Sequence, residues 1–273
     1  MLDTVKNPLL LLFVSFLGLT AWGQETIDFD MSFQPNVTRI VKNKNVIISS
    51  MEFGGTEEAL ARIKERGLEN PTVVKDSSSN TARIVYGPMK DGRISSVSTV
   101  LESDDPTNKI GSITYAQIED GVIRIDSILD GSNGMINEDI KELTNEVMSQ
   151  YDLPSKTMSI GDSLVTEQPI SIDLQNFIVE LNMKSYYVLK EIKDGKAHFD
   201  IALEYEMISD IEEIDLNLEG IGTGFLVYNI DGKFQQDYTM QSDMTIKIVG
   251  FGAEMKVGLS SARTQTVEQF ASD

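Results

Sequence analysis

Residues 186–207 read YYVLKEIKDGKAHFDIALEYEM and contain the clearest structural pattern in this chain. Two runs of alternating apolar and polar residues flank Asp194-Gly195, a dipeptide that favours a tight two-residue turn because glycine adopts positive φ without strain. In the second run one face is apolar, while the other carries His198 and Asp200. This period of two is typical of a half-buried strand. The stretch therefore predicts a β-hairpin, and the segments after it are expected to extend the same sheet.

Residues 234–249 form a longer alternating run. Apolar side chains occupy most even positions, and Gln, Asp, Thr and Lys occupy the odd ones from 235 to 247. The alternation holds for roughly 15 residues, whereas a typical strand has five or six. We expect a strand of this length to bend or coil, because β-sheets twist. Further second-half strands are expected at 170–182, 224–230 and 253–267.

The first half reads as an antiparallel meander. A strand or short hairpin is expected at 37–51, with 42–45 as a plausible turn. Asp91-Gly92 and Asp120-Gly121 predict tight turns, and such short connections join antiparallel neighbours. The other strands of this half are expected at 73–74, 82–86, 94–101, 110–118 and 122–129.

Two segments have the signature of a helix. Residues 56–66 begin at a capping Thr56, have acidic residues in the first turn and basic residues in the last, and end before Gly67. Residues 137–151 begin at Asn137 and carry a longer apolar stripe, which belongs against a sheet. The expected fold class is mainly β (α+β), with long curved antiparallel sheets, each covered by a helix, and two half-barrels as one possible arrangement of them.

The N-terminus resembles a secretory signal peptide. An apolar run at 9–19 follows Lys6 and precedes Ala21 and Gly23. It is too short to span a bilayer, which takes about 20 residues. We expect residues 1–23 to be cleaved on export, with an uncleaved membrane anchor as the alternative. The product is expected to be periplasmic or extracellular, without a later transmembrane segment.

The remaining chain is expected to have two β-rich halves. Pro154 and Gly161-Asp162 interrupt the pattern between them. The expected segments are a mobile N-terminal arm at 24–36, a first half at 37–152, a connector at 153–163, a second half at 164–268 and a tail at 269–273.

Composition argues against several classes of function. The formal net charge is −20, so we expect no nucleic-acid partner. The chain has no cysteine and one histidine, which argues against cysteine nucleophiles and against zinc sites. That histidine, His198, is expected to be a solvent-facing structural residue. No Gly-x-Ser-x-Gly motif occurs. We expect a protein that is not an enzyme and has no cofactor and no metal.

Two acidic stretches leave alternatives open. Residues 126–139 do not match the calcium-loop register, so a turn is expected, with a weak surface calcium site as the alternative. Residues 209–219 supply carboxylates of the kind that a glycosidase uses. Gly220, Gly222 and Gly224 precede a strand and not a helix, which favours a bulge or a closely packed strand over a phosphate-binding loop.

The apolar face of the second-half sheet is the remaining candidate site. The chain has 12 methionines, and several fall in these strands. Methionine adapts to varied apolar ligands, and a long curved sheet with few aromatics leaves a groove. An ordinary β core is the alternative. The groove candidates are Met183, Phe199, Leu203, Met207, Tyr238, Met240, Met244 and Ile246.

Three sets of segments occur in order along the second half: LPSK…GDS within 153–163, YYVLKE at 186–191, and GTG…DGK within 222–233. Over residues 153–267 the chain resembles an uncharacterised family of exported bacterial β-rich proteins, and more distantly the LolA-like periplasmic carriers. The resemblance implies a duplicated, strongly curved sheet with helices, and it implies no catalytic residues.

The expected function is that of a non-enzymatic exported protein. It binds a hydrophobic or amphiphilic small molecule, or an envelope protein, in the groove of its curved sheet. The alternative is a structural or adhesive cell-envelope component with a fully packed core. A carboxylate-based hydrolase that uses residues 209–219 is a third hypothesis.

Overall fold

The computed structural model describes residues 25–65, 67, 69–105, 108–130, 153–173, 178–209, 214–250 and 253–272. The predicted signal peptide and the predicted helix at 137–151 lie outside these residues, as does most of the acidic stretch at 126–139. Within the described ranges, no helix combines the length and the hydropathy that crossing a membrane requires.

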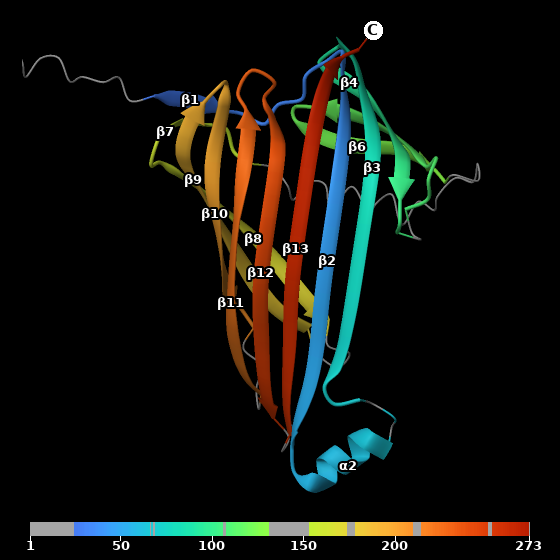
Figure 1. Cartoon of the computed structure of the whole chain (residues 1–273), viewed down its shortest axis with the longest axis vertical. Helices are drawn as coiled ribbons and strands as arrows, with labels where there is room; N and C mark the ends of the chain where they lie inside the picture. The colour runs from blue at the N-terminus through green and yellow to red at the C-terminus, as the bar shows by residue number, and fades with distance from the viewer. Residues whose placement is uncertain are drawn as a thin grey trace, which may run out of the picture.

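One antiparallel sheet of 11 strands dominates the fold (Figure 1). Its strand order is β6-β5-β4-β3-β2-β13-β12-β11-β10-β9-β8. The first-half strands are β2 (Val37–Gly55), β3 (Thr72–Lys90), β4 (Arg93–Ser103), β5 (Ile113–Glu119) and β6 (Val122–Leu129). The second-half strands are β8 (Ser163–Asp173), β9 (Ile178–Lys193), β10 (Lys196–Met207), β11 (Ile214–Asn229), β12 (Phe234–Gly250) and β13 (Ala253–Ala271).

The two halves share this sheet because its last strand pairs with one of its first. β13 and β2 run antiparallel over 19 residues each, from Ala271 opposite Val37 to Ala253 opposite Gly55. The prediction of a mainly β, antiparallel fold is confirmed. The suggestion of two half-barrels is wrong, because the 11 strands form one continuous sheet. The sequence did not reveal this, because a pairing between distant segments such as β13 and β2 leaves no local pattern.

Tight turns with two left-handed residues connect three of the hairpins, as expected. Positive φ at both central positions gives a turn whose twist matches that of the flanking strands. These residues are Asp91 and Gly92 (φ 52° and 78°), Asp120 and Gly121 (52° and 82°), and Asp194 and Gly195 (51° and 70°). The hairpin predicted at 186–207 is therefore confirmed.

Some predicted strand boundaries are wrong. The turn expected at 42–45 does not exist, because β2 continues through these residues and pairs with both β13 and β3. The short strands expected at 73–74 and 82–86 are parts of the single strand β3. The strand expected at 170–182 is divided between β8 and β9. The length of these strands is set by pairing with neighbouring strands on both sides. Polar residues inside a strand make it look interrupted in the sequence, although the pairing continues through them.

The glycines of β11 lie where neighbouring strands approach closely. A Cβ atom on Gly224 would lie 2.1 Å from the backbone oxygen of Thr239, and one on Gly222 would lie 2.8 Å from Leu203 Cδ1. The expectation of a closely packed strand at these glycines is confirmed.

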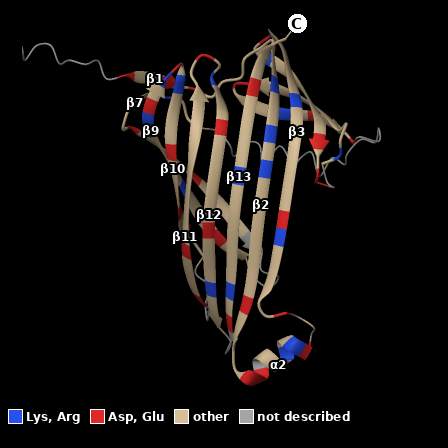
Figure 2. Ribbon diagram, viewed as in Figure 1, with Lys and Arg blue, Asp and Glu red and all other residues tan. Residues whose placement is uncertain are grey.

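The two faces of the sheet differ in character. Along β12, Met240, Met244, Ile246 and Ile248 are buried on the inner face, whereas the opposite face is polar and charged. Figure 2 shows Lys, Arg, Asp and Glu spread along the long strands. Charged side chains favour water over an apolar contact, so we infer that this outer face is solvated.

A second sheet of two short strands covers the upper part of the inner face. β1 (Thr26–Phe29) pairs antiparallel with β7 (Lys156–Ser159). Ile27, Phe29 and Met158 are buried in one cluster with residues of β9, β10 and β11. The arm at 24–36 is therefore not a mobile segment outside the fold, and the connector at 153–163 is part of the same core. We call β1 and β7 together the ribbon.

The lower part of the sheet curves strongly, so that its inner faces pack on each other. Val179 and Leu181 of β9 are buried in one cluster with Met244 and Ile246 of β12. In Figure 1, β8 runs diagonally behind the long front strands. This curvature brings inner faces of the second half against each other, which agrees with the predicted bending of long strands.

The helix expected at 56–66 is present as α2 (Glu57–Glu65). The backbone oxygen of Thr56 accepts a hydrogen bond from the amide of Leu60, which places Thr56 at the cap as predicted. However, α2 lies at the lower end of the molecule, between β2 and β3, and does not lie across a face of the sheet (Figure 1).

Candidate functional site

The eight predicted groove residues pack into cores and line neither cavity described below. Phe199, Leu203 and Met240 are buried in the upper cluster, and Met183 and Tyr238 pack against it. In the lower cluster Met244 and Ile246 are buried, and Met207 packs against them. Side chains of the ribbon occupy the upper part of the predicted groove, and Val179 and Leu181 of β9 occupy the lower part.

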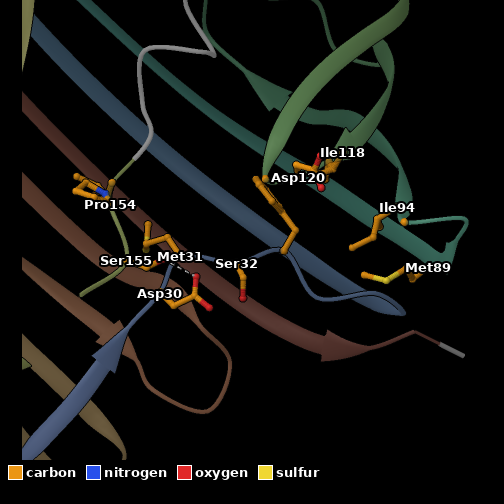
Figure 3. Close-up of a pocket in the computed structure, with 13 residues that line it drawn as sticks. Asp30, Met31, Ser32, Met89, Ile94, Ile118, Asp120, Pro154 and Ser155 are labelled. Atoms are coloured by element: carbon orange, nitrogen blue, oxygen red, sulfur yellow. Dashed lines mark hydrogen bonds between the residues drawn. The ribbon is translucent and has the colours of Figure 1, made fainter. Parts of the chain in front are cut away.

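Open space lies at the upper end of the sheet, beside the segment that joins β1 to β2. A cavity of about 580 Å³ lies between this segment, residues 153–155 and the turns that follow β3 and β5. We call it the large cavity. Figure 3 shows Asp30 and Met31 on one side of it and Ile94 and Ile118 on the other. Its lining residues are Asp30, Met31, Ser32, Phe33, Met89, Gly92, Ile94, Ile118, Asp120, Gly121, Leu153, Pro154 and Ser155.

A second cavity of about 210 Å³, the small cavity, adjoins the large one. Met31, Ser32 and Phe33 line both, so residues 31–33 form the partition between them. The other residues of the small cavity come from β2, β3, β12, β13 and the turn before β12. They are Arg39, Val41, Tyr86, Lys233, Phe234, Gln235, Gln265 and Val267.

Hydrogen bonds at Asp30 fix the start of the partition. Lys233 Nζ donates to Asp30 Oδ2 at 2.8 Å, and Ser155 Oγ donates to Asp30 Oδ1 at 3.2 Å. The Tyr228 hydroxyl donates to the backbone oxygen of Asp30 at 2.8 Å. Asp30 thus links the partition to Ser155, directly before β7, to Tyr228 on β11 and to the turn before β12, which positions both cavities.

A chain of side-chain hydrogen bonds fixes the far end of the same segment. Arg39 Nε donates to Gln269 Oε1 at 2.8 Å, and Gln269 Nε2 donates to Gln34 Oε1 at 3.2 Å. Gln34 Nε2 then donates to the backbone oxygen of Asp231 at 3.0 Å. The segment is therefore held at both ends, and the walls of the two cavities are preorganised.

Arg39 is a buried cation in the wall of the small cavity. Its side chain points inward because the period of two places it on the same face of β2 as Val37 and Val41. Its guanidinium carbon lies 4.9 Å from the ring centre of Phe234 and 5.2 Å from that of Tyr86. Burial lowers the pKa of Arg39, while its interaction with Tyr86 acts in the opposite direction. An arginine remains charged at neutral pH despite such a shift.

The acidic groups beside the large cavity do not have the properties of a catalytic pair. The hydrogen bond from Lys233 holds the pKa of Asp30 below its usual value, whereas a general acid needs a raised pKa. Asp120, the other acid in the wall, lies exposed in a turn. This geometry gives no support to acid–base hydrolysis at the cavity.

The other sequence-based candidates lie away from the cavities. In the acidic stretch at 209–219, Asp215 and Glu219 are exposed on β11, on the face opposite the buried residues. His198 is half-buried on β10. Over the described ranges, no three His, Cys, Asp or Glu side chains gather closely enough to hold a metal ion.

The residues of the two cavities were not predicted from the sequence. The sequence patterns place residues 30–33 in a mobile arm and give no role to Met89, near the end of β3, or to the turn at Asp120. One detectable signal was Arg39, a charged residue at an inward position between two apolar ones, because period-two alternation places positions 37, 39 and 41 on the same face.

Comparisons with known proteins assign no family. No protein-family model matches this chain, and no curated protein sequence matches it. Among solved structures, the chain is similar to the crystal structure of the outer membrane protein OprG from Pseudomonas aeruginosa, with 7% identity, 89% of this chain and 100% of that chain covered, and a TM-score of 0.22. A likeness this low carries no argument about function, which must be inferred from the geometry of the site.

Proposed function

We propose that this protein is an exported, non-enzymatic binding protein that holds a small amphiphilic molecule at the upper end of its curved sheet. The observation that carries the proposal is the pair of adjacent cavities, about 580 and 210 Å³, on either side of residues 31–33. Their walls combine apolar side chains such as Met31 and Phe33 with polar ones such as Asp30 and Arg39, and small-molecule sites use both kinds of contact. Export rests on the predicted signal peptide at 1–23.

The large cavity is about half open to solvent, and its size favours a ligand site over a structural surface without one. A cavity of 580 Å³ has the volume of about 20 water molecules in the liquid. A purely structural or adhesive component predicts no cavity above a few water volumes. Binding becomes more favourable when an alkyl chain replaces water against apolar residues such as Phe33, Ile94 and Ile118.

The unpaired positive charge lies on the side of the small cavity, whereas the acids Asp30 and Asp120 line the large one and Asp30 is paired with Lys233. Met31 and Phe33 supply apolar contact to both cavities, so a chain can lie along them. The small cavity adds the cations Arg39 and Lys233. We therefore place the apolar part of the ligand in the large cavity and its polar end near the small one.

The test is a charge placed in the wall of the large cavity. Met89 is 57% exposed and lines this cavity, so Met89→Asp disturbs the ligand site without disturbing a core. Ile221 is 70% exposed on the outer face of β11, and Ile221→Asp is the matched control. Displacement of a neutral fluorescent dye by decanol measures the affinity of each protein.

We expect Met89→Asp to weaken decanol binding about tenfold, since an apolar contact worth about 1.4 kcal/mol changes a dissociation constant by that factor. Ile221→Asp should bind as the wild type does. If the wild type displaces no dye at all, or if the two variants weaken binding equally, the large cavity is not the ligand site.

A further inference from the structure

The Arg39 side chain has an unsatisfied hydrogen-bond donor. The residue is 8% exposed, and its Nη2 atom is buried without a hydrogen-bond partner. Nε is satisfied by Gln269. A buried donor without an acceptor destabilises a fold, and the cost is greater for a charged group. An occupant of the small cavity removes this cost when the guanidinium turns to present Nη2 to its acceptor oxygen.

The aromatic neighbours do not replace such an acceptor. Phe234 and Tyr86 lie close to the guanidinium carbon, at 4.9 and 5.2 Å from ring centre to carbon. Cation–π contacts stabilise the positive charge as a whole, and the Tyr86 side chain also interacts with the guanidinium through a hydrogen bond, but Nη2 still has no acceptor. They also restrain the guanidinium, which lowers the entropy lost when a ligand binds.

The charge balance around the small cavity identifies the missing partner. Its described lining contains two cations, Arg39 and Lys233, and no acidic side chain. Lys233 already has a carboxylate, since its Nζ lies 2.8 Å from Asp30 Oδ2. Arg39 is therefore the cation of this wall without a carboxylate, in a chain whose formal net charge is −20. A ligand with one negative charge would neutralise the unpaired charge of Arg39.

We infer that Arg39 binds the carboxylate head group of an amphiphilic ligand in the small cavity, with Nη2 donating to a carboxylate oxygen. The inference rests on the proposed function and specifies the class of ligand: a monoanionic amphiphile such as a medium-chain fatty acid. The head lies between Arg39 and Lys233, and the alkyl chain passes Met31 and Phe33 into the large cavity.

A calorimetric titration with three probes of equal chain length tests the inference. Decanoate carries one negative charge, decanol carries none, and decyl phosphate carries more than one. Each is titrated into the wild type and into Arg39→Met, Arg39→Lys and Arg83→Met. Arg83 is an exposed residue of β3 and controls for the loss of an arginine elsewhere.

We expect the wild type to bind decanoate about tenfold or more tightly than decanol, the size of a charge-assisted hydrogen bond. Arg39→Met should lose this preference and keep its affinity for decanol. Arg39→Lys should keep part of the preference, and Arg83→Met should keep all of it. The wild-type comparison requires no variant and decides the question even if Arg39→Met does not fold.

The possible failures are distinguishable. Equal affinity of the wild type for decanoate and decanol overturns the role of Arg39 and leaves the proposed function standing. Tighter binding of decyl phosphate than of decanoate overturns the assignment of a carboxylate. Absence of binding by all three probes overturns the proposed function itself.

Discussion

Replacing Phe29 by alanine tests whether the ribbon is a docked part of the core. Phe29 is 1% exposed, and its ring centre lies 5.4 Å from that of Phe199 and 4.9 Å from that of Tyr228. Removing a buried phenylalanine costs about 3–5 kcal/mol, of which aromatic pairing accounts for about 0.5–1.5. We expect Phe29→Ala to lower the free energy of unfolding by about 4 kcal/mol.

The matched control is Phe225→Ala, which removes a phenylalanine that is 47% exposed on β11. Its loss should be about 1 kcal/mol or less. Phe29→Leu keeps most of the apolar volume and should cost less than about 1.5 kcal/mol. Urea denaturation followed by far-UV circular dichroism gives all three values. If Phe29→Ala costs no more than Phe225→Ala, the ribbon does not pack on the sheet, and the predicted groove is open after all.

Three further changes have defined outcomes. Gly224→Ala forces a Cβ atom to within 2.1 Å of the Thr239 backbone oxygen, so we expect a loss of about 3 kcal/mol in the free energy of unfolding by urea titration; a loss below that of Thr223→Ala on the exposed face would contradict the close approach. Gly195→Ala places a side chain at φ 70°, and thermal denaturation should show a loss of about 1 kcal/mol; an unchanged melting temperature would argue against the left-handed turn. Lys233→Met removes the partner that lowers the pKa of Asp30 from 3.8. Because the folded-state pKa is the lower one, the ion pair contributes fully above the unfolded-state value and is lost as the pH falls through the folded-state value. The variant should therefore be less stable than the wild type by up to about 1 kcal/mol at neutral pH, and the difference should disappear in acid; a difference that persists at low pH would not come from this ion pair.

Local patterns predicted much of this fold because they arise from interactions between neighbours in sequence. The Asp194-Gly195 turn and the alternation along β12 each depend on a few adjacent residues, and both agree with the structure. Polar residues inside β2 were mistaken for a turn because their strand is stabilised by pairing on both sides. The local sequence does not reveal that pairing.

The candidate site was harder to predict because distant segments build it. β1 pairs with β7 across more than a hundred residues, and neither four-residue strand has a pattern of its own. Once the ribbon occupies the inner face, the methionine-lined surface becomes core, and the remaining space moves to the upper end. Arg39 gave a local indication of the site, because it is a charged residue at an inward-facing position of a strand.

Photocrosslinking tests the location of the ligand most directly. Decanoate that carries a diazirine on its alkyl chain is bound to the full protein, irradiated, and located by peptide mapping with mass spectrometry. The geometry of the cavities predicts labelling in residues 31–33 and in Ile94 or Ile118, with competition by unlabelled decanoate. Met240 and Met244 are buried on the inner face of β12. Labelling of either residue would contradict this location and would place the ligand in the groove that the ribbon and β9 occupy.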